Sequence, residues 1–390
     1  MGLGEDGPEG LPPASLHALA RAEVIAGAAR HLALLRGCAA ERMEWPVPFA
    51  DGLPRLLALR GRAVAMLASG DPFWFGAGTT VTRALGPGEW RALPAPSTFG
   101  LAAARLGWAV ETCVCLGLHA APLARLRRHL APGVRAIVLL RDGAAVGDLA
   151  RWLTGLGFGA SRLHALEALG GPRERVRSGT AGAMDLSDVS HPVAAAVEVA
   201  GTGATLPWAV GLPDGVFAHD GQITKRPVRA LTLSALAPRP GELLWDVGAG
   251  SGSVGIEWLL AHPATRAIAV EARPDRAARL RANADALGCD RLLLVEGAAP
   301  EALEGLPPPQ AVFVGGGLSE RLLLALWERM PEGARLVANA VTLESEALLA
   351  GWHARTGGAL MRIEIAEAGS IGPRRGWKSA YPVVQWSVAR

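Results

Sequence analysis

The sequence has few cysteines, and their spacing fits neither a disulfide framework nor a metal site. Its 390 residues include only Cys38, Cys113, Cys115 and Cys289. None of them forms a Cys-x-x-Cys pair of the zinc-binding kind. Four cysteines in a chain of this length are also too few for the disulfide framework typical of small secreted proteins. Cys113 and Cys115 would share one face of a strand, which favours buried packing over metal binding. We therefore predict reduced thiols, no metal and a cytoplasmic location.

Long apolar runs and a strong net charge are also lacking. No run approaches the roughly 20 residues of a membrane-spanning helix, and the amino terminus has no basic region followed by an apolar one. The formal net charge is only +3, and the basic residues are scattered along the chain. A dedicated nucleic-acid binder concentrates positive charge on one surface. We therefore expect neither a membrane nor a nucleic acid as a partner.

What the chain does have is enough apolar material for two domains. Hydrophobic residues make up 50% of it and charged residues 19%, which excludes long disordered segments. Because one core seldom serves as many as 390 residues, two domains are the simplest division. The composition becomes small and turn-rich from about residue 178 to residue 207, so we place the boundary between about residues 190 and 207. The predicted domains are residues 1–195 and 206–390, both of the α/β class.

The second domain contains a strand, a glycine-rich turn and the start of a helix. Residues 244–255 read Leu-Trp-Asp-Val-Gly-Ala-Gly-Ser-Gly-Ser-Val-Gly. Such a turn lets backbone N–H groups approach a ligand closely, and the helix that follows adds a partial positive charge. The spacing of Gly250, Gly252 and Gly255 also satisfies the dinucleotide fingerprint of a dehydrogenase. The glycines alone therefore leave a nicotinamide-dependent oxidoreductase open.

Two acids beside the turn favour another cofactor. Asp246 lies two residues before the first glycine, and Glu271 ends the next apolar run, where a carboxylate can bind both hydroxyls of a ribose. An acid followed by Gly-x-Gly-x-Gly resembles the first motif of Rossmann-like S-adenosylmethionine (SAM) methyltransferases. The resemblance implies that Asp246 reaches the amino-acid end of SAM, often through water. It also implies a mostly parallel sheet, and the closing residues suit a final antiparallel strand pair. The alternative is a structural turn with two solvated acids.

The first domain carries a different set of motifs. They are the glycine-rich opening with Gly4, the turn Ser69-Gly70-Asp71-Pro72 after a strand, Pro96-Ser97-Thr98 before a helix, and a run with Glu167, Gly170 and Glu174. In this order they resemble the tetrapyrrole (corrin/porphyrin) methylases, a SAM-binding family with a two-part α/β fold. The residues for which the resemblance implies contact with SAM are Gly4, Gly70, Asp71, Ser97 and Thr98.

Three further interpretations concern the first domain. Apolar spacing predicts a helix over residues 13–29. Because no strand precedes the opening glycine turn in the sequence, we expect the native start to lie upstream of Met1. His119 follows Leu118 where the family subtype often has Leu-His-Gly-Arg, but two alanines replace the last two residues. His119 is therefore either a catalytic candidate or a partly buried structural histidine.

Residues 212–229, just ahead of the second glycine turn, resemble the decarboxylating precorrin methyltransferases of cobalamin biosynthesis. In that family the threonine of a Thr-Lys pair lies against the cofactor, which implies this role for Thr224. Lys225 is one of only two lysines in the chain and is a catalytic candidate. A later small-residue turn suits an adenine ring, so the backbone of Ala299 is expected there, although Ala298 stands where the family usually has an acid. The residues expected to bind SAM in this domain are Thr224, Asp246, Gly248, Ala249, Gly250, Ser251, Gly252, Glu271 and Ala299.

Together the resemblances imply an enzyme that methylates C5 and C15 of a precorrin and removes the ring-C acetate carboxyl as carbon dioxide, with one SAM site in each domain. Arginines are the natural clamps for the carboxylates of such a substrate, and Arg226 and Arg229 are candidates. We also expect the chain to form a homo-oligomer. The alternatives are a Rossmann methyltransferase of RNA or protein with an unrelated first domain, a nicotinamide-dependent oxidoreductase, and a non-catalytic tetrapyrrole carrier.

Overall fold

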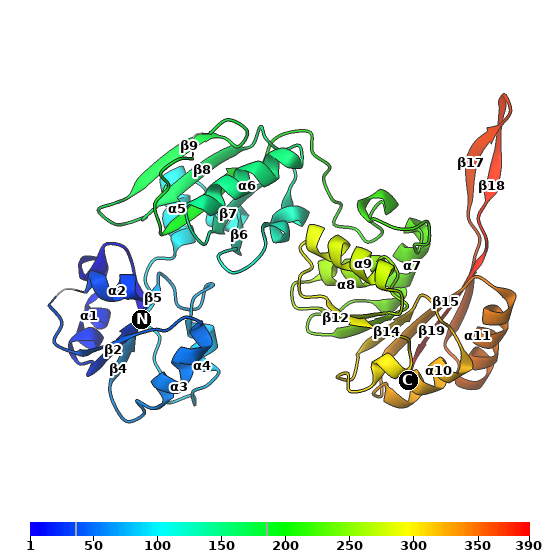
Figure 1. Cartoon of the computed structure of the whole chain (residues 1–390), viewed down its shortest axis with the longest axis horizontal. Coiled ribbons are helices and arrows are strands. Elements are labelled where there is room, and N and C mark those ends of the chain that lie inside the picture. Colours follow the sequence, from blue (N-terminus) through cyan, green and yellow to red (C-terminus); the bar gives the residue numbers. More distant parts are fainter. Residues whose placement is uncertain (36, 185) are drawn as a thin grey trace. The chain divides into compact units, whose positions relative to one another are not determined.

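The chain folds into two compact units, and Figure 1 labels many of their helices and strands. The computed structural model describes residues 1–35, 37–184 and 186–390. The amino-terminal unit comprises Met1–Leu123 and His129–Thr205, and the carboxy-terminal unit comprises Ala124–Arg128 and Leu206–Arg390. Within the described ranges, no helix is both long enough and apolar enough to cross a membrane.

The first part of the amino-terminal unit is built on a parallel three-stranded sheet. Its elements are β1 (Gly2–Leu3), η1 (Gly7–Gly10), α1 (Pro13–Ala20), β2 (Val24–Gly27), α2 (Ala29–Leu34), β3 (Glu41–Glu44), η2 (Phe49–Asp51), α3 (Gly52–Leu57), β4 (Val64–Met66), β5 (Ala68–Ser69) and α4 (Gly78–Thr82). The strand order is β3-β2-β4, so β2 is central. Strand β2 corrects the helix expected over residues 13–29, because α1 ends at Ala20 and β2 is buried along its whole length. Val24 and Ile25 are β-branched residues, which pack well in a strand.

A short strand, β1, precedes the opening glycine turn, although no strand is apparent there in the sequence. Strand β1 pairs in parallel with β5, and the amino group of Met1 donates to the carbonyl of Met66 at 2.7 Å. A Cβ atom at Gly2 would stand 1.9 Å from the carbonyl oxygen of Gly70. Only a glycine therefore allows β1 to lie this close to the turn that follows β5.

The second part of the amino-terminal unit is a five-stranded sheet of order β6-β7-β10-β8-β9. Its elements are α5 (Thr98–Leu106), η3 (Val110–Thr112), β6 (Val114–Gly117), β7 (Arg135–Leu139), α6 (Ala144–Gly155), β8 (Arg162–Glu167), β9 (Arg175–Thr180) and β10 (Val193–Glu198). Between β6 and β7 the chain forms η4 (Leu123–His129), whose residues Ala124–Arg128 belong to the carboxy-terminal unit. Strand β10 lies inside the segment that reads as turn-rich, yet it is the central strand and pairs antiparallel with β7 and β8. Its Val-Ala-Ala-Ala-Val run is buried, with α5 packed against it and against β7.

The carboxy-terminal unit is a seven-stranded sheet of order β13-β12-β11-β14-β15-β19-β16. Its elements are η5 (Asp214–Val216), α7 (Arg226–Leu236), β11 (Leu243–Val247), α8 (Ser253–Ala261), β12 (Arg266–Glu271), α9 (Pro274–Ala286), β13 (Leu293–Glu296), η6 (Glu301–Leu303), β14 (Ala311–Val314), α10 (Glu320–Arg329), β15 (Arg335–Ala340), α11 (Leu343–Thr356), β16 (Ala359–Ile363), β17 (Ala366–Ile371), β18 (Arg374–Ser379) and β19 (Val383–Ala389). Strands β11 to β15 are parallel, and β19 is antiparallel to both β15 and β16. This strand order is Rossmann-like with a final antiparallel pair, and the unit follows a two-part α/β unit in the sequence. Both findings confirm the predicted fold class. The hairpin β17–β18 was not predicted.

Apolar layers cover both faces of this sheet. Trp245 and Trp386 belong to the layer formed with α10 and α11, and Trp258 belongs to the layer formed with α7, α8 and α9. Helices cover both faces, so a ligand cannot bind there. In sheets of this kind ligands bind instead at the loops that follow the carboxyl ends of the strands. The glycine turn after β11 lies at that edge.

Candidate active site

The turn after β11 has the backbone conformation that its glycines predict. Gly248, Gly250 and Gly252 have φ angles of 67°, 59° and 75°. A Cβ at Gly248 would stand 2.6 Å from the carbonyl oxygen of Gly316, and one at Gly252 would stand 2.6 Å from Leu280. A Cβ at Gly250 would meet no described atom within 4 Å. The turn is therefore tight on its inner side and open at Gly250, where a ligand can approach the backbone.

Asp246 is buried at the end of β11, beside the first turn of α8. Its Oδ2 accepts a hydrogen bond from Gly255 N at 2.8 Å, and a Cβ at Gly255 would stand 2.9 Å from the same oxygen. Contact with the acid therefore explains the third glycine of the apparent dinucleotide pattern. The other oxygen, Oδ1, is buried and has no hydrogen-bond partner among the described residues. Burial raises the pKa of Asp246 to about 7, and the charge of Glu271 adds to the rise.

The raised pKa predicts a pH-dependent stability for the cofactor-free protein. The folded pKa of Asp246, about 7, lies above its ordinary value of 3.8, so its contribution to stability is fully present below 3.8 and is lost as the pH rises through about 7. We expect Asp246→Asn to gain stability relative to the wild type by a few kcal/mol between about pH 4 and about pH 8. Chemical unfolding of both proteins across this range measures the difference. A difference that stays constant with pH would contradict a buried, titrating Asp246.

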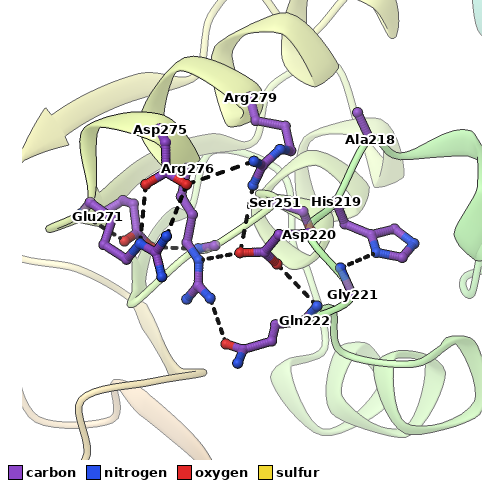
Figure 2. Close-up of polar contacts among 12 residues, drawn as sticks. Ala218, His219, Asp220, Gly221, Gln222, Ser251, Glu271, Asp275, Arg276 and Arg279 are labelled. Atoms are coloured by element: carbon purple, nitrogen blue, oxygen red, sulfur yellow. Dashed lines mark hydrogen bonds and ion pairs between the residues drawn. The ribbon is translucent and has the colours of Figure 1, made fainter.

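Glu271 ends β12 and is fastened to the glycine turn. Its Oε2 accepts from Gly250 N at 2.8 Å and its Oε1 accepts from Arg273 N at 2.9 Å. Each carboxylate oxygen has a second lone pair, so the side chain can still accept from two hydroxyl groups. Figure 2 shows Glu271 beside the start of α9.

Ser251 provides a second buried polar atom. Its Oγ has no hydrogen-bond partner within the described part of the chain, and its carbonyl accepts from Asn283 Nδ2 at 2.9 Å. Buried polar atoms are nearly always paired, so Ser251 Oγ and Asp246 Oδ1 indicate a ligand with polar groups. A carboxylate accepts from an amino group and a hydroxyl donates to a carboxyl group, which fits the amino-acid end of SAM.

The other predicted cofactor-binding residues of this unit follow the carboxyl ends of neighbouring strands and lie at the same edge of the sheet. Gly248 N and Ala249 N both donate to the carbonyl of Val270, at 2.9 and 3.1 Å. Gly297 N donates to the carbonyl of Glu271 at 3.0 Å, which ties the turn that contains Ala299 to the end of β12. The predicted residues that the structure gathers at the carboxyl ends of β11, β12 and β13 are Asp246, Gly248, Ala249, Gly250, Ser251, Gly252, Glu271 and Ala299.

Thr224 and Lys225 immediately precede α7. The carbonyl of Thr224 accepts from Arg229 Nη1, so the first turn of α7 fixes its backbone. Lys225 is exposed, and although its carbonyl accepts from Arg229 N at 2.8 Å, no hydrogen bond or ion pair joins its side chain to a described residue. Its ammonium group is therefore free to bind an anion.

Arg229 is not a substrate clamp, contrary to the expectation. Its side chain is 0% exposed, with Nε donating to Glu257 Oε1 at 2.6 Å and Nη1 to Asp214 Oδ1 at 3.0 Å. Its Nη2 donates to the carbonyl of Leu212. These contacts hold the segment before α7 onto α8, and none of them leaves the guanidinium open to a substrate. Arg226 is exposed and stays a candidate.

In the amino-terminal unit one cavity of about 700 Å³ collects the predicted residues. Those that line it are Gly4, Gly70, Asp71, Ser97, Thr98 and His119. Another cavity of this unit, about 740 Å³, is lined by none of them. The structure thus joins motifs that lie far apart in the sequence into one site.

Local hydrogen bonds shape the wall of this cavity. Gly70 has a φ of 54°, and a Cβ there would stand 2.9 Å from the carbonyl oxygen of Pro96. Asp71 Oδ1 accepts from the backbone N–H of Phe73 at 2.8 Å. Ser97 Oγ accepts from Gly100 N at 3.1 Å and caps α5. Both side chains therefore fix turns as well as lining the cavity.

His31 is a buried residue of the same cavity that sequence reasoning missed. Its Nε2 lies 3.2 Å from Ser69 Oγ, and its Nδ1 has no partner among the described residues. Burial, together with the charge of Arg30, lowers the pKa of His31 to about 3, so the ring is neutral. Arg30 itself pairs with Glu5 at 2.5 Å. No spacing in the sequence marks His31, because its neighbours in the cavity come from other segments.

The acid-flanked glycine turn on a Rossmann-like sheet, with polar atoms suited to an amino acid, defines a SAM-dependent methyltransferase. The sequence profile described as "Precorrin methyltransferase domain" matches residues 215–390, and that of the "Tetrapyrrole (Corrin/Porphyrin) Methylases" matches residues 1–185. Over 392 residues the chain is 52% identical to the precorrin-6Y C(5,15)-methyltransferase (decarboxylating) of a Sinorhizobium species, covering 99% of this chain and 95% of that protein. The chain therefore belongs to the family of decarboxylating precorrin-6Y C(5,15)-methyltransferases.

Two further similarities concern parts of the chain. Over 148 residues it is 42% identical to a probable cobalt-precorrin-6B C(15)-methyltransferase (decarboxylating) of Pyrobaculum calidifontis, covering 36% of this chain and 75% of that protein. The crystal structure of the C-terminal domain of the precorrin-6Y C5,15-methyltransferase from Rhodobacter capsulatus is 55% identical, covers 47% of this chain and 100% of that one, and has a TM-score of 0.46.

Family membership confirms the predicted family and the predicted enzyme class. It also decides the open question about Gly250, Gly252 and Gly255, which belong to a methyltransferase and not to a dehydrogenase. The family implies that SAM is the methyl donor. In the described ranges, no group of three or more His, Cys, Asp or Glu side chains is arranged to hold a metal ion.

Proposed function

We propose that the chain methylates C5 and C15 of a precorrin macrocycle and removes one acetate carboxyl, with one SAM site in each unit. The observation that carries the proposal is a pair of buried atoms beside the open turn at Gly250, Asp246 Oδ1 and Ser251 Oγ, neither of which has a hydrogen-bond partner among the residues that the structure describes. The cavity of the amino-terminal unit, with its glycine turn at Gly70, supports the second site.

We assign methylation at C15 and decarboxylation to the carboxy-terminal unit. The name of the Pyrobaculum relative joins these two reactions in one protein, and that protein matches only 36% of this chain. The precorrin methyltransferase profile lies within residues 215–390. Methylation at C5 then falls to the amino-terminal unit, which matches the tetrapyrrole methylases.

The residues of the carboxy-terminal unit bind and orient the reactants. When bound, SAM supplies a methyl group on a sulfonium centre, which an electron-rich meso carbon of the macrocycle can attack. Asp246 Oδ1 would accept from the amino group of SAM, Glu271 would accept from its ribose hydroxyls, and Thr224 would lie against it. Proximity and orientation supply much of the rate enhancement in such a reaction, so no nucleophile is required of the protein.

Lys225 and His119 are the candidates for direct contact with the substrate. Lys225 is a free cation beside Thr224 and can hold a substrate carboxylate as a point charge. The conjugated macrocycle accepts the electrons that loss of the carboxyl group leaves, so Lys225 only has to position that group. His119 lines the cavity of the amino-terminal unit.

We also propose that the chain assembles as a homo-oligomer. The hairpin β17–β18 projects from the sheet of its unit (Figure 1) and exposes Ile371 and Trp377. A two-stranded ribbon is marginally stable alone in water, so contact with another copy would stabilise it. Light scattering on the purified chain measures the mass of the assembly.

Mass spectrometry after incubation with precorrin-6B and SAM tests the proposed reaction. We expect the product to have gained two methyl groups and lost one carbon dioxide. Omission of SAM is the control and should leave the pigment intact. An unchanged mass with bound pigment would instead indicate a tetrapyrrole carrier, and a methylated RNA or protein would indicate the other methyltransferase class.

A further inference from the structure

Residues 218–225, here called the strap, lead from the buried Phe217 to Thr224 and Lys225 at the start of α7. The strap contains neither helix nor strand. Its position therefore depends on side-chain contacts with its neighbours. Figure 2 shows Asp220 and Gln222 of the strap facing Arg276 and Arg279, close to Glu271 and Ser251.

Arg276, in the first turn of α9, makes two contacts with the strap. Its Nε lies 2.8 Å from Asp220 Oδ2, and its Nη2 donates to Gln222 Oε1 at 2.6 Å. Both partners of the ion pair are mostly buried, with side chains 18% and 24% exposed. Asp220 Oδ1 also accepts from Gln222 N at 3.0 Å, and this bond together with Arg276 lowers the pKa of Asp220 to about 2. Asp220 is therefore a carboxylate at neutral pH, where it can pair with Arg276.

The same helix also links the strap to the glycine turn. Asn283 Oδ1 accepts from Ala218 N at 2.8 Å, and its Nδ2 donates to the carbonyls of Ala218 and Ser251, both at 2.9 Å. Asn283 is 5% exposed. Helix α9 thus holds the first half of the strap through Asn283 and Arg276, while Arg229 holds the carbonyl of Thr224 at its far end.

We propose that Arg276 is a positioning residue of the carboxy-terminal SAM site, which holds the strap, and with it Thr224, against the glycine turn. The proposal rests on the proposed function, because it assumes that this turn and Thr224 bind SAM. Without Arg276, the contacts that hold the middle of the strap to the rest of the described chain would be the longer ion pair of Asp220 with Arg279, at 3.7 Å, and the packing of Ile223 against the apolar layer of the unit. SAM would then have to order the strap on binding, and the free-energy cost of this ordering would weaken SAM affinity. Arg276 would thus affect affinity although it does not contact SAM itself.

Arg276→Ala in the full chain tests the role of Arg276 through two readouts. In the cofactor-free protein we expect faster hydrogen exchange at the amides of Gly221 and Gln222. In calorimetry we expect SAM affinity to fall about fivefold at one site and to stay unchanged at the other. Arg276→Lys can keep the ion pair with Asp220 but not the bond to Gln222, so it should recover part of both effects.

Arg273→Ala is the matched control. Arg273 precedes the same helix and pairs with Asp275 at 3.0 Å, and in the described part of the chain no hydrogen bond or ion pair joins its side chain to the strap. Arg273→Ala therefore removes the same charge as Arg276→Ala and leaves the contacts of the strap in place. We expect wild-type exchange in the strap and wild-type SAM affinity.

Faster hydrogen exchange in the strap of Arg276→Ala with unchanged SAM affinity would overturn the proposal, since Arg276 would then stabilise the fold without affecting SAM binding. Equal effects of Arg273→Ala and Arg276→Ala would also overturn it, because loss of charge alone would suffice. A wild-type chain that binds a single SAM would contradict the two-site function instead. The affinity of that single site and the exchange of the strap would still decide the role of Arg276.

Discussion

Replacing Asp246 by alanine is expected to leave the full chain with one working SAM site and one methylation. The variant loses Oδ1, which is buried and has no hydrogen-bond partner in the described part of the chain, and Oδ2, the acceptor for Gly255 N. Hydrogen bonds to charged groups contribute about 1.5–3 kcal/mol each, so SAM affinity in the carboxy-terminal unit should fall by roughly 100-fold. The amino-terminal cavity shares no residue with this turn and should keep its affinity. Calorimetry measures the stoichiometry, and mass spectrometry should find a pigment that retains its carboxyl group.

Two variants separate the sites further. Asp246→Asn keeps an acceptor for Gly255 N but removes the charge, so its effect on SAM binding should be smaller. Gly70→Val places a side chain against the carbonyl of Pro96, where even a Cβ would stand at 2.9 Å, and should impair the other site. An Asp246→Ala chain that folds but binds SAM at neither site would contradict two independent sites. Binding at both sites would remove Asp246 from the cofactor site.

The carboxy-terminal fold could be predicted because its signals are local. Strand β11, the glycine turn and α8 follow one another directly, and Asp246 and Glu271 are placed by the ends of their own strands. Strand β2 was missed because Val24 continues the apolar spacing of α1, and only the neighbouring β3 and β4 make a strand of it. Strand β10 was missed because three successive alanines have little strand preference of their own, and burial between β7 and β8 decides their state.

The residues that hold the strap in place could not be predicted, since each of them contacts a segment that is distant in the sequence. Asn283 binds the strap 65 residues earlier, and Arg276 binds Asp220 56 residues earlier. Nothing in the local sequence distinguishes Arg276 from other arginines on exposed helix faces. Arg229 shows the opposite error, because its place beside Thr224 favoured a role in binding while its burial assigns it to the fold.

Arg229→Ala is therefore expected to destabilise the carboxy-terminal unit by about 3–5 kcal/mol, because it leaves the carboxylate of Glu257 buried without its cation. Glu257 is 3% exposed and, among the described residues, would keep the hydrogen bonds from the backbone N–H groups of Gly211 and Leu212 and the charge of Arg128 nearby. The carbonyls of Leu212 and Thr224 would lose their donor as well. Because a chain with two units need not unfold in one step, hydrogen exchange in β11 and β12 is the appropriate measurement.

Arg226→Ala is the matched control, since it removes the same charge from the exposed start of the same helix. It should change the stability of the unit by less than about 0.5 kcal/mol. A second comparison uses Arg229→Met with Glu257→Leu, which replaces the ion pair by apolar groups and should restore much of the loss. If Arg229→Ala were no more harmful than Arg226→Ala, the buried pair would not hold the segment before α7. Arg229 would then return as a candidate for binding the carboxylates of the substrate.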